Sequence, residues 1–564
     1  MNDAVAVTID HEAVANEAKH WVRLTAACNS KCVFCLDAEA QDGRFMAFDD
    51  ICNEVQRGRD DKQASRLVVS GGEATIHPRF HDVVRFGKQA GYRWVQTVTN
   101  GQRLADRDFF LRAVEAGLDE ITFSLHGHTP ELHDRLTKTK NGFENLMRAM
   151  IRAVRDGRVI VNVDVCINKQ NVEHLEAIVA LCSRVGVREF DLLHVIPQGV
   201  AFEHRDELFY DVDAHAESLR RVFRLARHPG FHVWTNRFPV SHLEGMEELI
   251  QDPHKMLDEV GGRRVQFRRY LDQGAPIDCR DKERCPHCFI EPFCTALDGH
   301  VRAHREGKVD VLDVGERWDL ADLAGGARWL GGRGRPAVLD RPLYLRADDA
   351  RGIPLPAGSR VIATRPEHLA IPGDAEIELH PDREFAAWLA EHPEALTARH
   401  VIHGTTFAKA SEAAAHEPDW AALFGVLPPG TRAQNLPACL CPQARIEAAP
   451  RVIHLDMYHE QGELGIDAFV DRYIESMYRA KSLRCRACPA TDRCEGAHIQ
   501  SIRARGFGQL QPLSGDWASQ AVAQLAALGP RLRGGSPPES PAPRLAVPGA
   551  PPVPFIDKDA GRRS

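Results

Sequence analysis

The sequence contains 564 residues, of which 43% are hydrophobic and 27% are charged, a composition typical of soluble globular proteins with sizeable cores. At about 150 residues per domain, this length predicts roughly four structural units and argues against one small domain. The 71 lysines and arginines against 79 acidic residues give a net charge of −8, so the charge balance does not indicate a nucleic-acid partner.

The chain has neither a membrane-spanning run nor a secretory signal pattern. No apolar segment approaches the roughly 18 residues that cross a bilayer, and the N-terminal residues lack the basic-then-apolar order of a signal peptide. We therefore expect a cytoplasmic protein without a membrane partner. In a reducing compartment, clustered cysteines are more often metal ligands than disulfides, and most of the 15 cysteines fall into three groups.

The first two-fifths of the chain predicts an α/β fold. Short β-rich runs alternate with amphipathic stretches, as in a parallel sheet with crossover helices, and we expect the strands to be apolar on both faces. Helical patterns at 107–117, 143–157 and 172–186 each end at a glycine, a common helix terminus. Six such units predict a partial (β/α)6 TIM-like barrel, with ligands at the carboxyl ends of the strands. The expected strands are 21–25, 66–73, 94–101, 120–127, 159–167 and 190–197, with a further candidate at 231–236.

The remainder of the chain is divided by composition. Strand-like runs at 359–364 and 399–405 and a helical run at 383–392 predict a small α/β or α+β segment. The last residues are rich in proline, glycine and serine, which predicts a disordered tail. The expected organisation is an N-terminal extension (1–20), the core barrel (21–239), a first cluster module (240–325), a linker with the α/β segment (326–435), a second cysteine-rich module (436–528) and the tail (529–564).

The first cysteine group follows the first expected strand. Cys28, Cys32 and Cys35 have the spacing Cys-x3-Cys-x2-Cys. Three thiolates on one loop can hold three irons of a cubane cluster and leave the fourth iron open to a small molecule. The alternative is a structural zinc loop that takes a fourth ligand from elsewhere.

Three further motifs lie after later strands. The second strand is followed by GGEAT (71–75), the third ends in TNG (99–101), and the fourth ends in SLHG (124–127). With the three-cysteine loop and an aromatic residue before its last cysteine, these motifs resemble the radical S-adenosylmethionine (SAM) superfamily over about residues 21–239. Ala74 stands where the family's GGE run usually continues with proline.

The resemblance implies a cofactor site. The first-group thiols would bind a 4Fe–4S cluster whose open iron chelates SAM. No motif singles out a catalytic residue among the side chains. The implied SAM contacts are Phe34 and Ile196 to adenine, Gly72 and Glu73 to the methionine amino group, Ser124 to the polar part, and, as a weaker candidate for the ribose, Asn168.

The other cysteine groups contain an internal repeat. The spacing Cys-x2-Cys-x5-Cys occurs at 285–294 and again at 485–494, which chance alone does not explain. Both resemble the auxiliary-cluster extensions (SPASM or twitch type) of radical SAM enzymes, implying one or two auxiliary iron–sulfur clusters, with structural zinc as the alternative. The expected ligands are Cys279, Cys285, Cys288 and Cys294 in the first copy, and Cys485, Cys488 and Cys494 with Cys441 or Cys439 in the second.

The resemblance further implies a function. The enzyme would reductively cleave SAM to a 5′-deoxyadenosyl radical that abstracts hydrogen from a substrate, with electrons from a reductant such as flavodoxin or ferredoxin. The expected substrate is a peptide or a small-molecule cofactor precursor. One alternative is chemistry similar to that of the molybdenum-cofactor radical SAM enzyme, and another is a non-catalytic zinc-binding interaction protein on a degenerate barrel.

Histidines near the expected site have two interpretations. His126, His128 and His133 lie at or after the fourth strand, where loop or capping roles are favoured over proton donation. His194, on the sixth strand, is a candidate to point into the barrel and touch substrate.

Overall fold

The computed structural model describes residues 18–37, 43–305, 311–313, 342–350, 355, 357–450, 452–459 and 464–528. These residues form two compact units, one comprising residues up to 252 with 282–289, the other comprising 253–281 and the residues from 290 onward. The expected tail and the glycine-rich part of the linker lie outside the described residues. Within the described part, no helix has the length and apolar character needed to cross a membrane.

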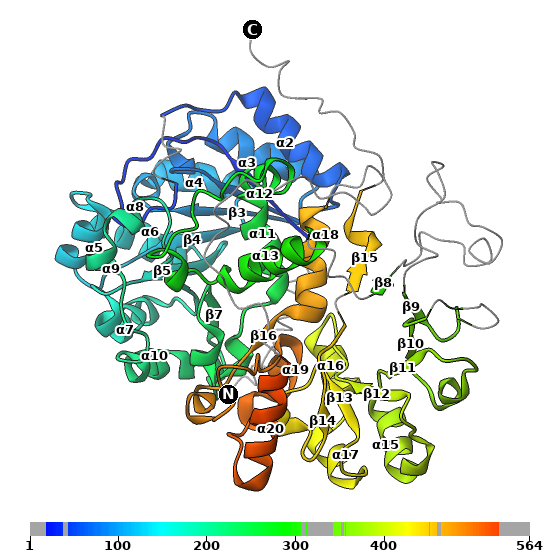
Figure 1. Ribbon diagram of the computed structural model, residues 1–564. Helices are drawn as coiled ribbons and strands as arrows, with labels where there is room; N and C mark the ends of the chain where they lie inside the picture. Colours follow the sequence, from blue (N-terminus) through cyan, green and yellow to red (C-terminus); the bar gives the residue numbers. More distant parts are fainter. Residues whose placement is uncertain are drawn as a thin grey trace, which may run out of the picture. The chain divides into compact units, whose positions relative to one another are not determined.

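The first unit is built on a seven-stranded parallel sheet in the order β1-β2-β3-β4-β5-β6-β7 (Figure 1). Strands that are adjacent in the sheet are therefore also consecutive in the sequence. Because β7 does not pair with β1 among the described strands, the sheet forms an open, partial barrel. This confirms the predicted α/β fold, including the seventh strand. The strands are β1 (Lys19–Arg23), β2 (Arg66–Ser70), β3 (Trp94–Thr99), β4 (Glu120–Ser124), β5 (Ile160–Ile167), β6 (Glu189–His194) and β7 (His232–Asn236).

Helices connect these strands, and local capping fixes their ends. The Asp106 carboxylate accepts the backbone N–H of Phe109 at the start of α4, which satisfies one of the free donors at a helix N-terminus. Gly157 and Gly186 end α6 and α7 at positive φ, as predicted from their positions. The helices are α2 (Phe48–Asp60), α3 (Phe80–Gln89), α4 (Arg107–Glu115), α5 (Pro130–Thr137), α6 (Gly142–Asp156), α7 (Leu175–Val185), α8 (Val200–Glu203), α9 (Arg205–Leu208) and α10 (Ala216–Phe223).

The two faces of the barrel strands differ. On β5, Val163, Val165 and Ile167 are fully buried, whereas the alternate positions are polar and include Asp164. Because successive side chains on a strand point to opposite faces, β5 presents an apolar face and a polar one. The expectation that the strands are apolar on both faces is therefore wrong for β5.

The second unit contains an eight-stranded parallel sheet in the order β14-β13-β12-β11-β10-β9-β8-β15. The predicted small α/β segment is thus part of a larger parallel sheet. An antiparallel pair, β16 (Arg479–Ala480) and β17 (Ala497–His498), follows later in the chain. The sheet strands are β8 (Val311–Asp313), β9 (Leu343–Arg346), β10 (Arg360–Ala363), β11 (Glu376–Leu379), β12 (His400–His403), β13 (Arg432–Gln434), β14 (Arg445–Ile446) and β15 (Val452–His454).

The helices of the second unit are short. At the start of α15, the Asp382 carboxylate accepts the backbone N–H of Phe385. The helices are α11 (Met256–Gly261), α12 (Arg264–Gln273), α13 (Glu291–Arg305), α15 (Arg383–Glu391), α16 (Ala410–His416), α17 (Trp420–Val426), α18 (Ile466–Arg472), α19 (Ile499–Arg505) and α20 (Gly515–Ala527).

Candidate cofactor site

The three-cysteine loop follows β1 and is held by backbone hydrogen bonds. Lys31 N–H donates to the Thr137 carbonyl and Val33 N–H to the Leu136 carbonyl, each at 3.0 Å, so the loop is fixed to the end of α5. The Cys35 carbonyl accepts the Val200 N–H at 3.0 Å. These contacts present three cysteines, none of them in a disulfide, from one ordered segment.

The thiols lie within electrostatic range of one another. Burial, with smaller contributions from Glu73 and Cys35, raises the pKa of the Cys28 thiol to about 11. Burial, with the neighbouring Cys28 and Cys35, also raises the pKa of Cys32 strongly. Because only the thiolate binds metal, a bound cation must supply the charge that stabilises these groups. The loop therefore fits a bound metal ion or a cationic cluster.

The two glycines of the GGE run bring the loop after β2 against the cysteine loop. Gly72 N–H donates to the Thr25 carbonyl at 2.8 Å, and Glu73 N–H donates to the Ala27 carbonyl at 2.9 Å. A Cβ at Gly72 would lie 2.2 Å from the Ala27 oxygen. Glycine is thus required by the close approach of two backbone segments next to the thiols.

The Glu73 side chain connects the GGE and TNG motifs. It is 2% exposed, and one carboxylate oxygen accepts Thr75 N–H at 2.9 Å and Thr99 Oγ1–H at 2.8 Å. The other oxygen accepts Asn100 N–H at 2.8 Å. Burial raises the pKa of Glu73, and these donors partly offset the rise.

The TNG motif also contacts the cysteine loop directly. Asn100 Nδ2 donates to Asn29 Oδ1 at 2.7 Å and to Ser30 Oγ at 3.2 Å, and Gln102 Nε2 donates to Ser30 Oγ at 3.0 Å. Sequence reasoning missed Asn29 and Ser30, which lie between the first two cysteines and offered no recognisable pattern. The three motifs therefore form one hydrogen-bonded assembly at the carboxyl ends of β1, β2 and β3.

The other expected SAM contacts lie in different surroundings. Phe34 is buried in an apolar cluster with Val33, Leu132 and Leu136, and its ring meets the His126 ring edge-on at 4.5 Å. Ile196 is 2% exposed and lies two residues beyond the end of β6 rather than on that strand. Both positions are apolar, as an adenine contact requires.

Two histidine expectations are resolved by hydrogen bonds. His126 Nδ1 accepts the Cys166 N–H, and His133 Nδ1 accepts the His126 N–H, each at 3.2 Å. Both are buried, which lowers the pKa of His133 to about 4. Their structural role is confirmed.

Two weaker candidates are also occupied elsewhere. The His194 Nδ1 contacts the Tyr210 hydroxyl at 3.0 Å, and His194 lies on the strand face of the buried Phe190 and Leu192. The Asn168 Nδ2 donates to the Cys166 carbonyl at 3.0 Å, and its Oδ1 accepts Gln170 N–H at 3.0 Å. The described contacts therefore give neither residue a role toward substrate or ribose.

Ser124 leads to a residue that sequence reasoning missed. Its hydroxyl donates to Asp164 Oδ2 at 3.2 Å, and Asp164 is paired in register with Asp191 on β6. Burial raises the pKa of Asp164 to about 7, with a further contribution from Asp191. Among the described residues, Asp164 Oδ1 has no hydrogen-bond partner. The signal available in the sequence was the polar alternation of NVDVC (162–166).

Replacing Asp164 by asparagine should change the pH dependence of stability. Between about pH 4 and pH 7 the folded protein holds a proton on Asp164 that the unfolded chain has lost, so wild-type stability falls as pH rises through this window. The neutral Asp164→Asn variant lacks this loss. We expect its free energy of unfolding, measured by denaturant titration and relative to that of the wild type, to rise from about pH 4 to pH 7 by up to a few kcal/mol, at roughly 1.4 kcal/mol for each unit of pKa difference. A constant difference across this range would contradict the assignment.

The second cysteine repeat reproduces the backbone of the first. Cys288 N–H donates to the Cys285 carbonyl at 3.1 Å, and Cys488 N–H donates to the Cys485 carbonyl at 3.0 Å. The backbone N–H of the third cysteine in each copy donates to the carbonyl four residues earlier, from Cys294 to Ile290 and from Cys494 to Ala490. The repeat read from spacing is therefore also a structural repeat. Cys279 and Cys294 belong to the second unit and Cys285 and Cys288 to the first, so that ligand set stays a prediction.

The structure distinguishes the two candidates for the fourth thiol of the second copy. The Cys439 thiol lies within electrostatic range of Cys494, Cys485 and Cys488, which together with burial raise its pKa to about 12. Cys441 is fully buried and couples only to Cys439 and Cys494; its sulfur lies 3.5 Å from the Pro437 carbonyl oxygen. These electrostatic neighbours favour Cys439 over Cys441, two candidates between which the spacing did not decide.

Comparison with known proteins finds a similarity for part of the first unit. The sequence model of the Radical SAM superfamily matches residues 22–182. This part of the chain is therefore similar to that superfamily. The matched segment covers the three-cysteine loop, the GGE and TNG motifs and Ser124.

Curated relatives match the same part of the chain. A probable GTP 3′,8-cyclase of Saccharolobus islandicus is 31% identical over 191 residues, covering 33% of this chain and 61% of the relative. The corresponding protein of Sulfurisphaera tokodaii is 26% identical over 207 residues, covering 36% and 62%. This chain thus spans about three-fifths of the length of these relatives.

Solved structures with similarity to part of this chain were also found. Streptococcus suis SuiB bound to the precursor peptide SuiA has a TM-score of 0.35 and 16% identity, covering 42% of this chain and 52% of that one. The enzyme anSMEcpe with bound AdoMet and the Kp18Cys peptide has a TM-score of 0.33 and 15% identity, covering 38% and 63%.

Proposed function

We propose that this chain is a radical SAM enzyme. The observation that carries the proposal is the hydrogen-bonded assembly of the three-cysteine loop with the GGE and TNG motifs. Cys28, Cys32 and Cys35 hold a 4Fe–4S cluster that, when bound and reduced, supplies the electron for cleavage of SAM to a 5′-deoxyadenosyl radical. The radical abstracts hydrogen from a substrate carbon.

The protein residues bind and orient the cofactor. Phe34 and Ile196 provide apolar surface for adenine. Gly72 presents backbone beside the cysteine loop, and Glu73 provides negative charge for the amino group through the oxygen that accepts one hydrogen bond. Ser124, oriented by Asp164, faces the polar part of SAM. The buried surroundings exclude water from a reactive intermediate.

Anaerobic reconstitution tests the proposal. After loading with iron and sulfide, the full chain should convert SAM to 5′-deoxyadenosine when a reductant is added, which chromatography can quantify. A protein that holds zinc without iron and forms no 5′-deoxyadenosine would instead support a zinc-binding interaction protein.

We further propose auxiliary clusters in the two cysteine repeats. A set of four thiolates closes a cluster, which suits electron transfer from a substrate radical. Cys279, Cys285, Cys288 and Cys294 form one set. Cys485, Cys488 and Cys494 form the second, and of the two candidates for its fourth ligand we favour Cys439, which lies within electrostatic range of all three thiols.

Paired alanine variants separate Cys439 from Cys441. Cys439→Ala should lower iron by up to about 4 per chain, since a cubane cluster holds four irons. Cys441→Ala, two residues away and more deeply buried, should keep the wild-type iron and sulfide content. Iron and labile sulfide are counted after anaerobic desalting. Loss of iron in Cys441→Ala alone would return the ligand role to Cys441.

Two classes of substrate are proposed. The first is a peptide or cofactor precursor that the enzyme modifies, supported by the resemblance of the repeats to auxiliary-cluster extensions. Nucleotide cyclisation is the second, supported by the GTP 3′,8-cyclase relatives. GTP and candidate peptides should therefore be compared for stimulation of 5′-deoxyadenosine formation. A flavodoxin or ferredoxin reductant and a cytoplasmic location accompany both proposals.

A further inference from the structure

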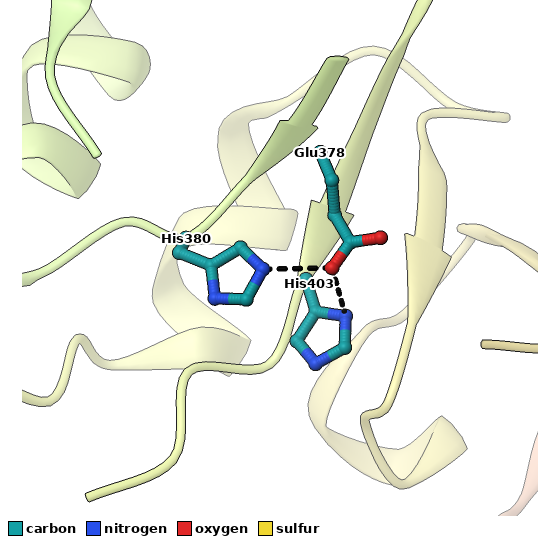
Figure 2. A group of neighbouring side chains, drawn as sticks. All are labelled: Glu378, His380 and His403. Atoms are coloured by element: carbon teal, nitrogen blue, oxygen red, sulfur yellow. Dashed lines mark hydrogen bonds and ion pairs between the residues drawn. The ribbon is translucent and has the colours of Figure 1, made fainter. Parts of the chain in front are cut away.

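Three potential metal ligands converge in the second unit, far in sequence from the cysteine repeats. Glu378 lies on β11, His380 directly follows β11, and His403 is the last residue of β12. Figure 2 shows both imidazole rings directed at one carboxylate oxygen. The His380 Nε2 lies 2.7 Å and the His403 Nδ1 lies 2.9 Å from Glu378 Oε1.

Strand register produces this convergence. Leu379 pairs with Ile402 across parallel strands β11 and β12, so the residues that follow them, His380 and His403, are neighbours. Their rings stack at 4.4 Å with an interplanar angle of 5°. Glu378 is two residues before His380 and shares its face. The group lies at the carboxyl ends of parallel strands, where open α/β sheets bind ligands.

The spacing and the exposure suit an ion. One ligand atom from each of the three residues can be chosen so that all lie within 4.8 Å of one another, and bonds of about 2.0–2.2 Å place cis ligands about 3 Å apart. The Glu378 side chain is 0% exposed, whereas those of His380 and His403 are 20% and 14% exposed. Solvent therefore reaches the imidazoles while the carboxylate is fixed.

Surrounding side chains orient the carboxylate. The Tyr344 hydroxyl donates to Glu378 Oε1 and lies 3.4 Å from His380 Nε2. Arg360 Nη1 donates to Glu378 Oε2 at 3.3 Å. The arginine therefore binds one oxygen and leaves the other directed at the two histidines.

The His403 ring also meets two side-chain amides. Gln434 Nε2 lies 2.9 Å from His403 Nδ1, and Asn435 Nδ2 lies 2.7 Å from His403 Nε2. Asn435 Oδ1 accepts from Arg479 at 2.6 Å. Binding of an ion at Nδ1 would place the ring proton on Nε2, so the Asn435 amide must turn to accept it. Ion binding is thus coupled to the Asn435–Arg479 contact.

We propose that Glu378, His380 and His403 bind one divalent transition-metal ion, of the zinc or ferrous-iron class. Two of the three ligand atoms are imidazole nitrogens, which suit these ions better than magnesium or calcium. Three protein ligands leave coordination positions open for water or a small anionic or carbonyl ligand. None of these three ligands is a thiolate.

Zinc binding by the full chain with its iron–sulfur clusters reconstituted tests this proposal. Equilibrium dialysis against Zn²⁺, with zinc, iron and labile sulfide measured in the same samples, should give one more zinc per wild-type chain than per His380→Ala or Glu378→Gln chain. The affinity of this zinc should fall at least about 100-fold in His380→Ala, more than for loss of an outer-shell partner. His416→Ala, an exposed histidine at the end of α16, is the matched control and should bind as wild type.

The variants keep the test decisive. Glu378 is buried, so Glu378→Gln is accompanied by a melting curve, while the half-exposed His380 can be removed with less effect on folding. Equal zinc in wild type and His380→Ala would overturn the proposal. So would extra zinc that appears only with loss of iron and sulfide, because that zinc would occupy thiolates. The readout is metal content, so this outcome is independent of whether SAM is cleaved.

Discussion

Cys32→Ala should abolish the formation of 5′-deoxyadenosine from SAM. Cys32 is the middle cysteine of the three in sequence, and its pKa is raised by burial and by both of the other thiols, so its removal takes one of three ligands from the set. We expect the rate of 5′-deoxyadenosine formation to fall more than about 100-fold, which exceeds the loss caused by changing a residue that only hydrogen-bonds to a ligand. Reconstituted protein should also lose about 4 irons per chain, the content of one cubane cluster.

Cys52→Ala is the matched control. Cys52 is a free thiol on α2 in the same unit and belongs to none of the three cysteine groups. This variant should retain wild-type iron, sulfide and 5′-deoxyadenosine formation. Wild-type activity in Cys32→Ala would exclude the three-cysteine loop as the cofactor site.

The barrel strands could be predicted because their local and global signals agree. Each expected run is rich in valine, isoleucine or aromatic residues, and successive runs begin 26 to 45 residues apart, which is long enough for one βα unit. The observed strands mostly end a few residues before the expected ones, as β2 ends at Ser70 and β3 at Thr99. The glycine and asparagine residues that follow form the loops of the site instead of continuing the sheet.

The polar groups of the site could be predicted less completely. Glu73 was expected to meet SAM, and the GGE motif gave no sign that its carboxylate also holds Thr75, Thr99 and Asn100. Asp164 was not recognised because it lies in an otherwise apolar run, in which polar residues occur only at the alternate positions that form one face of the strand. Such contacts depend on strand register, which cannot be read from the sequence.

The group of Glu378, His380 and His403 illustrates the same limit. The runs containing 399–405 and 383–392 were predicted correctly as strand and helix, yet the ligands come together only through the pairing of β11 with β12. Likewise, spacing alone left Cys439 and Cys441 equivalent. Their difference lies in side-chain direction, since two residues in an irregular loop need not face the same way.

Gly72→Ala should disrupt the cofactor site without adding or removing a ligand. The new methyl group would lie 2.2 Å from the Ala27 carbonyl oxygen, and that oxygen belongs to backbone that also accepts the Glu73 N–H. Neither segment can yield as a flexible side chain would, so the cysteine loop must move. Overpacking of this kind costs about 1–3 kcal/mol of folding free energy. A displacement of about 1 Å at the reacting centre can lower the rate roughly 100-fold.

Gly261→Ala provides the comparison. Gly261 ends α11, and a Cβ there would meet no atom within 4 Å, so alanine should be neutral or stabilising by up to about 1 kcal/mol in a helix. We expect Gly72→Ala to melt at a lower temperature, to hold less iron after reconstitution and to form 5′-deoxyadenosine about 100-fold more slowly, whereas Gly261→Ala should match wild type in iron and rate. If Gly72→Ala retained full iron and rate, the close approach of the two loops would not be what positions the thiols. If Gly72→Ala held full iron but formed 5′-deoxyadenosine more slowly, the substitution would act on SAM binding instead.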